Sequence, residues 1–429
     1  MSDEDTSTKR ISRRDALRIF GASGAGFTLG AGGTTLATRY ATAQGAKNAT
    51  SDAITSRAPF FGPHQAGIST PQQEHLQFAA FDLTVESAPE VRDLLRSWSE
   101  AAARMCAGEP AGENNYETFL PPDDTGEAFD LSAARLTITF GFGPSLFEKD
   151  GEDRFGLATK RPAALAEIPP LPGESLDEDR SGGDLCVQAC ADDPQVAFHA
   201  VRNLARIARG AAVMRWSQLG FGRTASTSKS QSTPRNLMGF KDGTSNIKAE
   251  DEDLMRRHVW VEAGDGSSWM NGGAYLVARR IRMLIEVWDR VSLDDQEKSI
   301  GRHKYTGAPI GKDREFAPPD LEAKDGDGEP LIPRTSHVRL SRQSEDERIL
   351  RRGYSFTDGI DVERGQLDAG LFFICYQRDP RKQFVPLQRR LGENDALNEY
   401  IQHTGSALFA CPPGASEGGY VGEGLFESV

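Results

Sequence analysis

Apolar and polar positions along the first half of the chain predict six elements in the order β-α-β-β-α-β. Strands are expected over residues 78–85, 135–140, 184–191 and 213–219, and helices are expected to begin after Ser87 and after Asp193. Ser87 and Glu90 have the spacing of a capping box, and the apolar residues that follow recur every three or four positions, as on one face of a helix. Asp193 precedes Pro194, which is typical of a capped helix with proline in its first turn.

The second half repeats this order of elements without repeating the residues. Strands are expected over residues 274–283, 337–340, 371–376 and 407–411. One helix is expected through Ile285 and Ile300, and another around Leu387, with Pro386 in its first turn or at a kink. The run at 371–376 is continuously apolar, which indicates a strand that is buried on both faces.

Two groups of this kind predict the α+β class, with two ferredoxin-like βαββαβ domains whose antiparallel sheets carry helices on one side. The length of 429 residues exceeds what one core usually serves, which also favours two domains. We expect an N-terminal domain over residues 58–238 and a C-terminal domain over 239–429. The polar segment 222–270 joins the halves, and a connection this long in a compact protein is usually functional. A pocket between the sheet and the helices of one domain would suit a flat apolar ligand.

Residues 1–43 have the pattern of a twin-arginine signal peptide, and residues 44–57 that of a flexible segment. Arg13 and Arg14 precede a weakly apolar stretch, which is followed by an Ala-Thr-Ala cleavage sequence at 41–43. The alternative is a short amphipathic helix in an N-terminal tail. A twin-arginine signal predicts export of an already folded protein to a periplasm, a cell surface or the medium. The apolar stretch is too short for a stable membrane span, so no membrane insertion is expected after cleavage.

The composition is that of an ordinary globular protein, with 38% hydrophobic and 26% charged residues. The formal net charge of −13 argues against a nucleic-acid partner, because binding to phosphates needs clustered Lys and Arg. The five cysteines are expected to be free and mostly buried. Cys186 and Cys190 lie on one predicted strand, roughly 13 Å apart, which is too far for a disulfide. Zinc would need two more ligands, and the sequence offers only His199 nearby.

Three separated segments contain residue types that together fit a haem site. Residues 239–246 read Gly-Phe-Lys-Asp-Gly-Thr-Ser-Asn, and His337 and Arg351 follow in the second half. A neutral imidazole binds iron axially, an arginine stabilises negative charge as a peroxide O–O bond breaks, and a carboxylate moves the peroxide proton. Each residue has an ordinary alternative when it is taken alone: Asp242 in a tight turn, His337 as a core histidine, and Arg351 on an exposed polar face.

The chain resembles the dye-decolorising peroxidase family over nearly all of the sequence after the predicted signal. The resemblance rests on those three segments and on further motifs at residues 58–68, 183–185, 191–194, 302–309 and 370–373. Within the family, the chain is similar to the twin-arginine-exported deferrochelatase/peroxidase branch of bacterial ferrous-iron uptake systems. The resemblance implies one haem b per chain, held in the C-terminal domain. No Cys-x-x-Cys-His sequence occurs, so the haem is expected to be non-covalent.

The resemblance assigns the main roles to three residues. Asp242 is the expected distal acid/base, Arg351 the distal arginine and His337 the proximal iron ligand. The remaining haem contacts are expected from Gly243, Thr244, Ser245, Arg339 and Arg342. Where the family has Asn-Pro-Arg, this chain has Ser-Arg-Gln at 341–343, and this departure affects the propionate contacts expected from Arg339 and Arg342.

The implied activity is that of a haem peroxidase, which reduces hydrogen peroxide and oxidises dyes, phenols or similar donors by one electron at a time. The main alternative is an iron-handling protein that releases iron from haem, or oxidises ferrous iron, for an uptake system. A passive haem-binding module is a third. Asp242 and Arg351 favour catalysis, because haem storage needs no distal proton carrier. The expected partners are peroxide and a reducing substrate, with iron-uptake components and a second copy of the chain as further candidates.

Overall fold

A computed structural model describes residues 57–113, 117–342 and 344–427, which lie in one compact unit, Thr55–Val429. The predicted signal peptide, and all of the predicted flexible segment except its last residue, lie outside the described residues. The described strands are β1 (His75–Leu83), β2 (Thr137–Phe142), β3 (Leu185–Ala191), β4 (Ala212–Arg223), β5 (Ala274–Met283), β6 (Leu350–Arg351), β7 (Tyr354–Asp361), β8 (Gln366–Gln377) and β9 (Ile401–Cys411).

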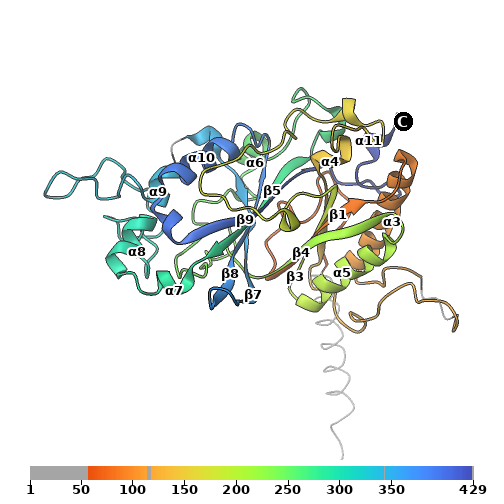
Figure 1. Cartoon of the computed structure of the whole chain (residues 1–429), viewed down its shortest axis with the longest axis horizontal. Helices are drawn as coiled ribbons and strands as arrows, with labels where there is room; N and C mark the ends of the chain where they lie inside the picture. The colour runs from red at the N-terminus through yellow and green to blue at the C-terminus, as the bar shows by residue number, and fades with distance from the viewer. Residues whose placement is uncertain (1–56, 114–116, 343, 428–429) are drawn as a thin grey trace, which may run out of the picture. The chain divides into compact units, whose positions relative to one another are not determined.

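Helices lie beside these strands in both parts of the chain. The described α-helices are α3 (Ala88–Cys106), α4 (Pro144–Phe147), α5 (Pro194–Ile207), α6 (Glu252–His258), α7 (Ile285–Trp288), α8 (Leu293–Ile300), α9 (His337–Leu340), α10 (Phe384–Asn394) and α11 (Glu423–Phe426). We call β1–β4 with α3–α5 the first half, and β5–β9 with α7–α10 the second half. Figure 1 shows α3 and α5 beside the strands of the first half, and α7 to α10 at the opposite end.

The strands of the two halves close into a single antiparallel barrel. Among the described residues, eight strands follow one another in the order β5-β9-β2-β3-β1-β4-β7-β8; β8 pairs with β5 to complete the ring, and the short β6 pairs with β8. The halves meet where Phe142 of β2 pairs with Ala410 of β9, and where Phe221 of β4 pairs with Ser355 of β7. Closure pairs the edge strands that two separate sheets would leave open.

The α+β class with antiparallel strands is confirmed, and each half has the same spatial order of strands. In the first half this order is β4-β1-β3-β2, and in the second half it is β9-β5-β8-β7. One helical connection follows the first strand of each half, and another follows the third. The sequence pattern indicates these elements one half at a time. It contains no signal for the two seams that join the halves into a barrel.

The elements predicted for the first half are confirmed within a few residues. Asp193 caps α5, because its side chain accepts hydrogen bonds from the backbone N–H groups of Gln195 and Val196. The capping box predicted before α3 is wrong in detail. The Ser87 hydroxyl donates to the Glu90 carboxylate at 2.6 Å instead of accepting a hydrogen bond from the helix backbone.

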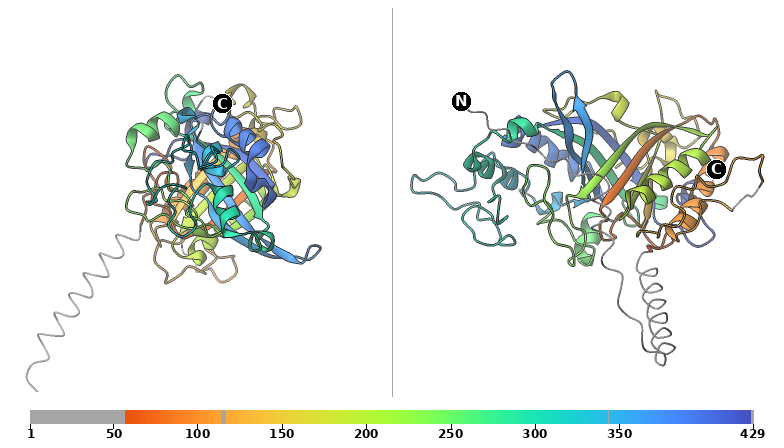
Figure 2. Two further views of the ribbon diagram at one scale, coloured as in Figure 1. Left: turned by 90° about the vertical axis from the view of Figure 1, so that its left-hand side faces the viewer. Right: turned by 90° about the horizontal axis from the view of Figure 1, so that it is seen from below.

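Two predictions for the second half are wrong. Residues 337–340 form the helical turn α9 instead of a strand, and the backbone N–H of Leu340 donates to the carbonyl of Ser336. The strand that takes this place in the repeated order is β7, which the sequence pattern did not indicate, because its outer residues 357–361 are mostly exposed and polar. Figure 2 shows the β7–β8 hairpin extending past the barrel. The single helix expected over 285–300 is two short helices, α7 and α8.

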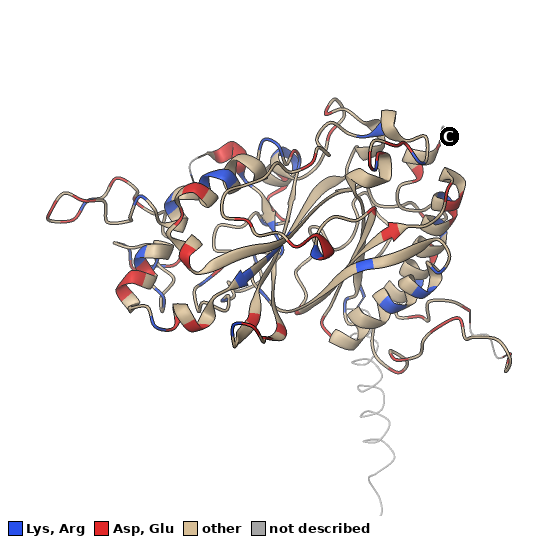
Figure 3. Cartoon of the chain, viewed as in Figure 1, with Lys and Arg blue, Asp and Glu red and all other residues tan. Residues whose placement is uncertain are grey.

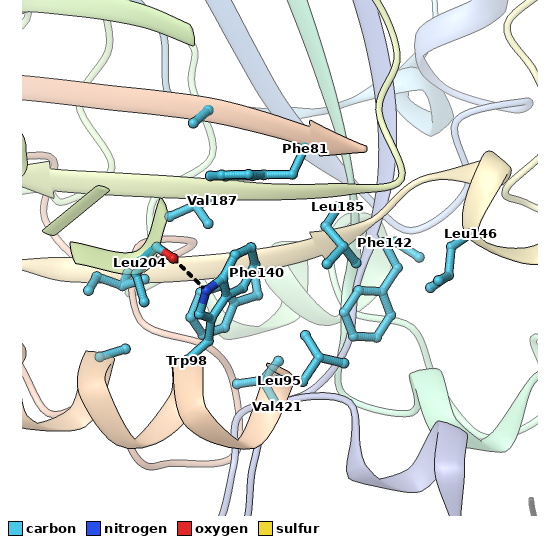
Figure 4. Packing of buried hydrophobic residues seen from close by; sticks show 14 of the residues in the cluster. Phe81, Leu95, Trp98, Phe140, Phe142, Leu146, Leu185, Val187, Leu204 and Val421 are labelled. Atoms are coloured by element: carbon cyan, nitrogen blue, oxygen red, sulfur yellow. Dashed lines mark hydrogen bonds between the residues drawn. The ribbon is translucent and has the colours of Figure 1, made fainter. Parts of the chain in front are cut away.

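Aromatic side chains fill the space between the sheet and the helices of the first half. Trp98 on α3 is fully buried, and its indole N–H donates to the backbone carbonyl of Leu204 on α5 at 2.9 Å. Its ring stacks on Phe140 of β2 with centroids 5.5 Å apart, and Phe81 of β1 meets it edge-on at 5.2 Å. Figure 4 shows this packing, which ties both helices to the sheet.

The cysteines are buried and free, as the sequence predicted. Cys186 and Cys190 lie on β3 in an apolar cluster with Cys411 of β9. Burial raises the pKa of the Cys190 thiol, so this side chain behaves as a small apolar group. None of the helices in the described ranges is long and apolar enough to cross a membrane.

Candidate active site

The second half contains a cavity of about 580 Å³ beside β5, β8 and β9, with α10 on another side. Pockets that hold cofactors typically have volumes of roughly 300–1,000 Å³. Much of the lining is apolar and includes Ile281, Met283, Leu371, Phe373, Leu387 and Ile401. The corresponding space in the first half is filled by the Trp98 cluster.

His337, the first residue of α9, contributes its imidazole to this cavity. Its Nδ1 donates a hydrogen bond of 2.6 Å to Oδ2 of Asp395, and 36% of the His337 side chain is open whereas the Asp395 carboxylate is almost fully buried. Burial acts to lower the pKa of His337, but the negative charge and the hydrogen bond of Asp395 outweigh it and raise the pKa. Because Nδ1 is engaged, Nε2 is the ring nitrogen available to a ligand in the cavity.

Asp242 and Arg351 form an ion pair that lines the same cavity. Nη1 of Arg351 lies 2.7 Å from Oδ1 of Asp242. The other carboxylate oxygen of Asp242 accepts a hydrogen bond from the Asn236 amide at 3.2 Å. A cation and an amide therefore orient the two oxygens of Asp242. The fold brings together three predicted residues from segments that lie far apart in the sequence.

Asn246 positions the backbone of Arg351. Its Oδ1 accepts from the backbone N–H of Arg351 at 2.8 Å, and its Nδ2 donates to the Arg351 carbonyl, also at 2.8 Å. Nδ2 also donates to the carbonyl of Ser226 at 3.1 Å. These contacts fix β6 against the loop that carries Asp242. The sequence presented Asn246 only as the last residue of a motif and gave no signal for Asn236.

The turn after Asp242 requires glycine. Gly243 has φ of +88°, and a Cβ at this position would lie 2.9 Å from the Cα of Ala225. The backbone N–H of Asn246 donates to the Gly243 carbonyl at 3.0 Å, which closes the turn. A side chain at residue 243 would therefore displace the loop and, with it, the Asp242 carboxylate.

The other predicted haem contacts divide into two groups. Thr244, Ser245 and Arg342 line the cavity, where the Thr244 hydroxyl donates to Glu315 at 3.2 Å and the Arg342 guanidinium bonds to the Ser245 hydroxyl. Arg339 does not line it. The Arg339 guanidinium donates instead to two backbone carbonyls of the loop before α9. The structure therefore brings together every predicted site residue except Arg339.

Basic side chains outnumber acidic ones around the cavity, although the chain has a net charge of −13. The charged lining consists of Lys241, Lys248, Arg302, Arg342, Arg348 and Arg351, with Asp242, Glu345, Glu347 and Asp395. Burial, and then the nearby charge of Arg342, lower the pKa of Arg302 to about 10. Figure 3 shows Lys and Arg interspersed with Asp and Glu over the chain as a whole. The local excess of positive charge favours an anionic group in the cavity.

These residues fit haem b. The apolar walls would cover the porphyrin, Nε2 of His337 would bind the iron, and the cations would pair with the propionates. The lining contains no cysteine, so nothing in it could form a thioether bond to the haem.

A second cavity of about 350 Å³ lies beside α3 and α5 in the first half. His199 lines it and donates from Nε2 to Asp124 at 2.9 Å. The other ionisable residues of its lining are Glu109 and Asp130, with no lysine or arginine among them. This cavity lacks an acid–arginine pair, so the larger cavity is the candidate active site.

Asp395 is the contact of His337 that the sequence did not identify. It follows α10 and lies 58 residues after His337 in the sequence. Its side chain accepts from the backbone N–H of Leu397 at 2.9 Å, as a cap of the next short helical turn. A capping aspartate is recognisable from sequence, but its second contact, with His337, depends on how α9 and α10 pack.

Family models match both parts of the chain. The model described as Dyp-type peroxidase, N-terminal, matches residues 65–222, and the model described as Dyp-type peroxidase, C-terminal, matches residues 233–416. The deferrochelatase of Escherichia coli strain K12 is 36% identical over 430 residues, which cover 98% of each chain. The deferrochelatase of Shigella flexneri is 38% identical over 384 residues, 88% of this chain and 89% of the relative.

Solved structures of similar proteins have the same fold. Ferric DtpA from Streptomyces lividans is 44% identical, with a TM-score of 0.79 over 87% of this chain and 97% of that chain. The DyP-type peroxidase from Cellulomonas bogoriensis is 39% identical, with a TM-score of 0.77 over 87% of this chain and 98% of that chain.

Proposed function

Because the chain belongs to the Dyp-type peroxidase family, we propose that Asp242, Arg351 and His337 are the working residues of its peroxidase activity. Membership in the family makes the chain a haem-dependent peroxidase, which binds haem b non-covalently and reduces hydrogen peroxide with electrons from a reducing substrate. The observation that carries the residue assignment is that the ion pair of Asp242 and Arg351 lines the same cavity as His337.

The roles of the three residues follow from their contacts. Haem b, when bound, supplies the redox-active iron at which peroxide is reduced. His337 would hold this iron through Nε2, while Asp395 fixes the ring and keeps the proton on Nδ1. Asp242 would accept a proton from one peroxide oxygen and deliver it to the other, and Arg351 would offset the negative charge that develops on the leaving oxygen. Two donors give one electron each, and with two protons one peroxide becomes two waters.

The finer features of the fold are part of the same proposal. We propose that the two halves are ferredoxin-like units within domains at 58–238 and 239–429, and that the second holds the haem. The shared order of strands and the position of the cavity support this division. Export by a twin-arginine signal at 1–43, to a periplasm, a cell surface or the medium, is proposed from the sequence. Sequencing the N-terminus of the exported protein would test it, and an uncut terminus would contradict it.

A second candidate function is iron handling for an uptake system, through release of iron from haem or oxidation of ferrous iron. The similarity to the deferrochelatases of Escherichia coli and Shigella flexneri favours it. The same cavity would serve this function, so the site residues do not separate the two. Measurement of free iron and of intact, metal-free porphyrin after haem loading would separate them.

The peroxidase assignment is tested with the variant Arg351→Ala. Loss of the guanidinium removes the charge that stabilises the leaving oxygen, so we expect the haem to stay bound and the first spectral change after rapid mixing with peroxide to slow by about 10²- to 10³-fold. The matched control is Arg364→Ala. Arg364 also pairs with an aspartate, Asp361, at 2.8 Å, but it lies on the exposed hairpin and outside the cavity. An unchanged rate in Arg351→Ala would show that the arginine has been assigned wrongly.

A further inference from the structure

Phe316 is an exposed aromatic side chain at the mouth of the active-site cavity. It lines the cavity, yet 72% of its surface is open. The other phenylalanines of the lining, Phe240, Phe373 and Phe384, are buried or partly buried. An aromatic ring of this size gains free energy when a second apolar surface covers it. Phe316 is therefore a contact surface next to the site of catalysis that the chain leaves uncovered.

The backbone next to Phe316 is fixed to the loop that carries the catalytic carboxylate. The carbonyl of Glu315 accepts a hydrogen bond from Nη1 of Arg302 at 3.0 Å. The Glu315 carboxylate accepts from the Thr244 hydroxyl at 3.2 Å and pairs with Lys241 at 3.4 Å. Both partners of this carboxylate belong to the catalytic loop. The backbone that carries Phe316 is thus held close to the reacting groups, and the ring itself is open to solvent.

Exposure alone does not make an aromatic residue a binding site, and Tyr305 provides the comparison. Tyr305 is 75% exposed. Its backbone is also held, because Arg235 donates to the Tyr305 carbonyl at 2.7 Å. Tyr305 does not line the cavity. It matches Phe316 in exposure and in anchoring, and it differs in position.

We propose that Phe316 is a stacking platform for the aromatic ring of the reducing substrate. The proposal rests on the peroxidase function proposed for this cavity. With haem in the apolar interior, a bulky phenol or dye can approach the cofactor from the exposed part of the lining, where Phe316 lies. Stacking on Phe316 covers apolar surface on both rings and holds the donor beside the cavity, so the donor does not have to enter it. The site therefore selects donors by their aromatic ring.

The test compares an aromatic donor with a donor that has no ring. For Phe316→Ala we expect the KM for 2-methoxyphenol to rise about 2- to 10-fold with an unchanged kcat, because one ring–ring contact is lost. The KM for ferrocyanide should stay the same. Phe316→Trp should keep the KM for 2-methoxyphenol close to that of the parent. Tyr305→Ala, the matched control, should leave all of these constants unchanged.

Binding without turnover provides a readout that does not depend on peroxide chemistry. The ¹⁹F signal of 4-fluorophenol should broaden on addition of the holoprotein and of Tyr305→Ala, and less with Phe316→Ala. Equal broadening in all three, or an unchanged KM for 2-methoxyphenol in Phe316→Ala, overturns the proposal. A parallel rise in KM for both donors, or a shifted Soret band, also overturns it, because Phe316 would then act through the haem. Failure of the peroxidase function looks different: the parent protein itself would show no spectral change with peroxide.

Discussion

The two halves of the molecule share an order of strands but use the space beside their sheets differently. In the first half, Trp98, Phe81 and Phe140 fill the space between the sheet and the helices. In the second half, a cavity of about 580 Å³ stays open in the corresponding place, and His337 and Arg351 line it. Both halves therefore have the same scaffold of strands, and the candidate active site lies in the half that leaves this space beside its sheet open.

Helix length accounts for much of this difference. In the first half, α3 has 19 residues and α5 has 14, and both pack along the sheet. In the second half, α7 and α9 have 4 residues each, α8 has 8 and α10 has 11. Short helices cover less of a sheet, and the loops between them supply polar and charged side chains to the cavity. Figure 1 shows how much of this end of the molecule consists of loops.

The comparison extends to a histidine–aspartate pair in each half. His337 bonds to Asp395 in the second half at 2.6 Å, and His199 bonds to Asp124 in the first half at 2.9 Å. Both carboxylates are nearly inaccessible. His337 bonds to its aspartate through Nδ1 and His199 through Nε2, and the surroundings of the two pairs also differ. Only the His337 pair lies in a cavity with an acid–arginine pair and a basic lining.

The largest expected effect separates these two histidines. His337→Ala should abolish haem binding, because it removes the nitrogen that we propose as the iron ligand, and haem titration followed by the Soret absorbance should show at most free or loosely bound haem. His199→Ala should bind haem as the parent protein does. Each variant leaves a buried carboxylate without its histidine partner, so the free energy of unfolding of the apoprotein should fall by about 1–3 kcal/mol in each. Loss of haem in His199→Ala, or tight binding in His337→Ala, would reverse the assignment of the halves.

The next largest effect concerns the filled space of the first half. Trp98→Ala should lower the free energy of unfolding by about 3–5 kcal/mol, because it leaves a hole in a close-packed cluster and removes the hydrogen bond to Leu204. Phe373→Ala, in the wall of the open cavity, should cost less, about 1–2 kcal/mol, because part of its ring has no packing partner to lose.

Urea unfolding of the two apoproteins measures the loss in free energy of unfolding. Haem titration measures the change in haem affinity. Phe373→Ala should weaken haem binding, whereas Trp98→Ala should leave it unchanged at temperatures where the variant is folded. If Phe373→Ala costs as much stability as Trp98→Ala, the second half is as tightly packed as the first, and the contrast between them fails.

The sequence predicts most of the elements of both halves but not the way in which the halves close. The spacing of apolar residues and the turn residues are local signals. They were sufficient to predict β1 to β5, and α5 with its cap at Asp193. The seams between β2 and β9 and between β4 and β7 depend on pairs such as Phe142 with Ala410, which are far apart in the chain. The exposed half of β7 has no apolar alternation, so the pattern gave no reason to expect a strand there.

The candidate site shows the same division between local and distant information. Asp242, Arg351 and His337 could be predicted because the family resemblance gives a role to the short motif that contains each of them, and the fold brings them into one cavity. Asn246 and Asp395 act through contacts with residues 105 and 58 positions away, and no spacing in the sequence indicates such contacts. The resemblance implied Arg339 as a propionate contact, but its side chain bonds to the loop before α9.

The smallest effect tests whether Asp395 changes the basicity of the His337 ring or only holds the ring in place. Asp395→Asn keeps a hydrogen-bond acceptor for Nδ1 of His337 but removes the negative charge that raises the pKa of the ring. A less basic imidazole is a weaker ligand, so haem should remain bound with an affinity about 10-fold lower. Haem transfer to apomyoglobin, followed by the Soret absorbance, measures the rate of loss.

Asp124→Asn is the matched control in the first half, and it decides what the comparison of the pairs means. Asp124 also accepts hydrogen bonds from the backbone N–H groups of Ala111 and Gly126, so its replacement should lower stability and leave haem loss unchanged. If Asp395→Asn likewise lowers only stability, its carboxylate is a structural cap, as in the first half. If haem loss is faster and the free energy of unfolding of the apoprotein is nearly unchanged, the negative charge of Asp395 strengthens His337 as a ligand of the iron. The same pair of side chains then has a structural role in the filled half and a ligand-tuning role in the open one.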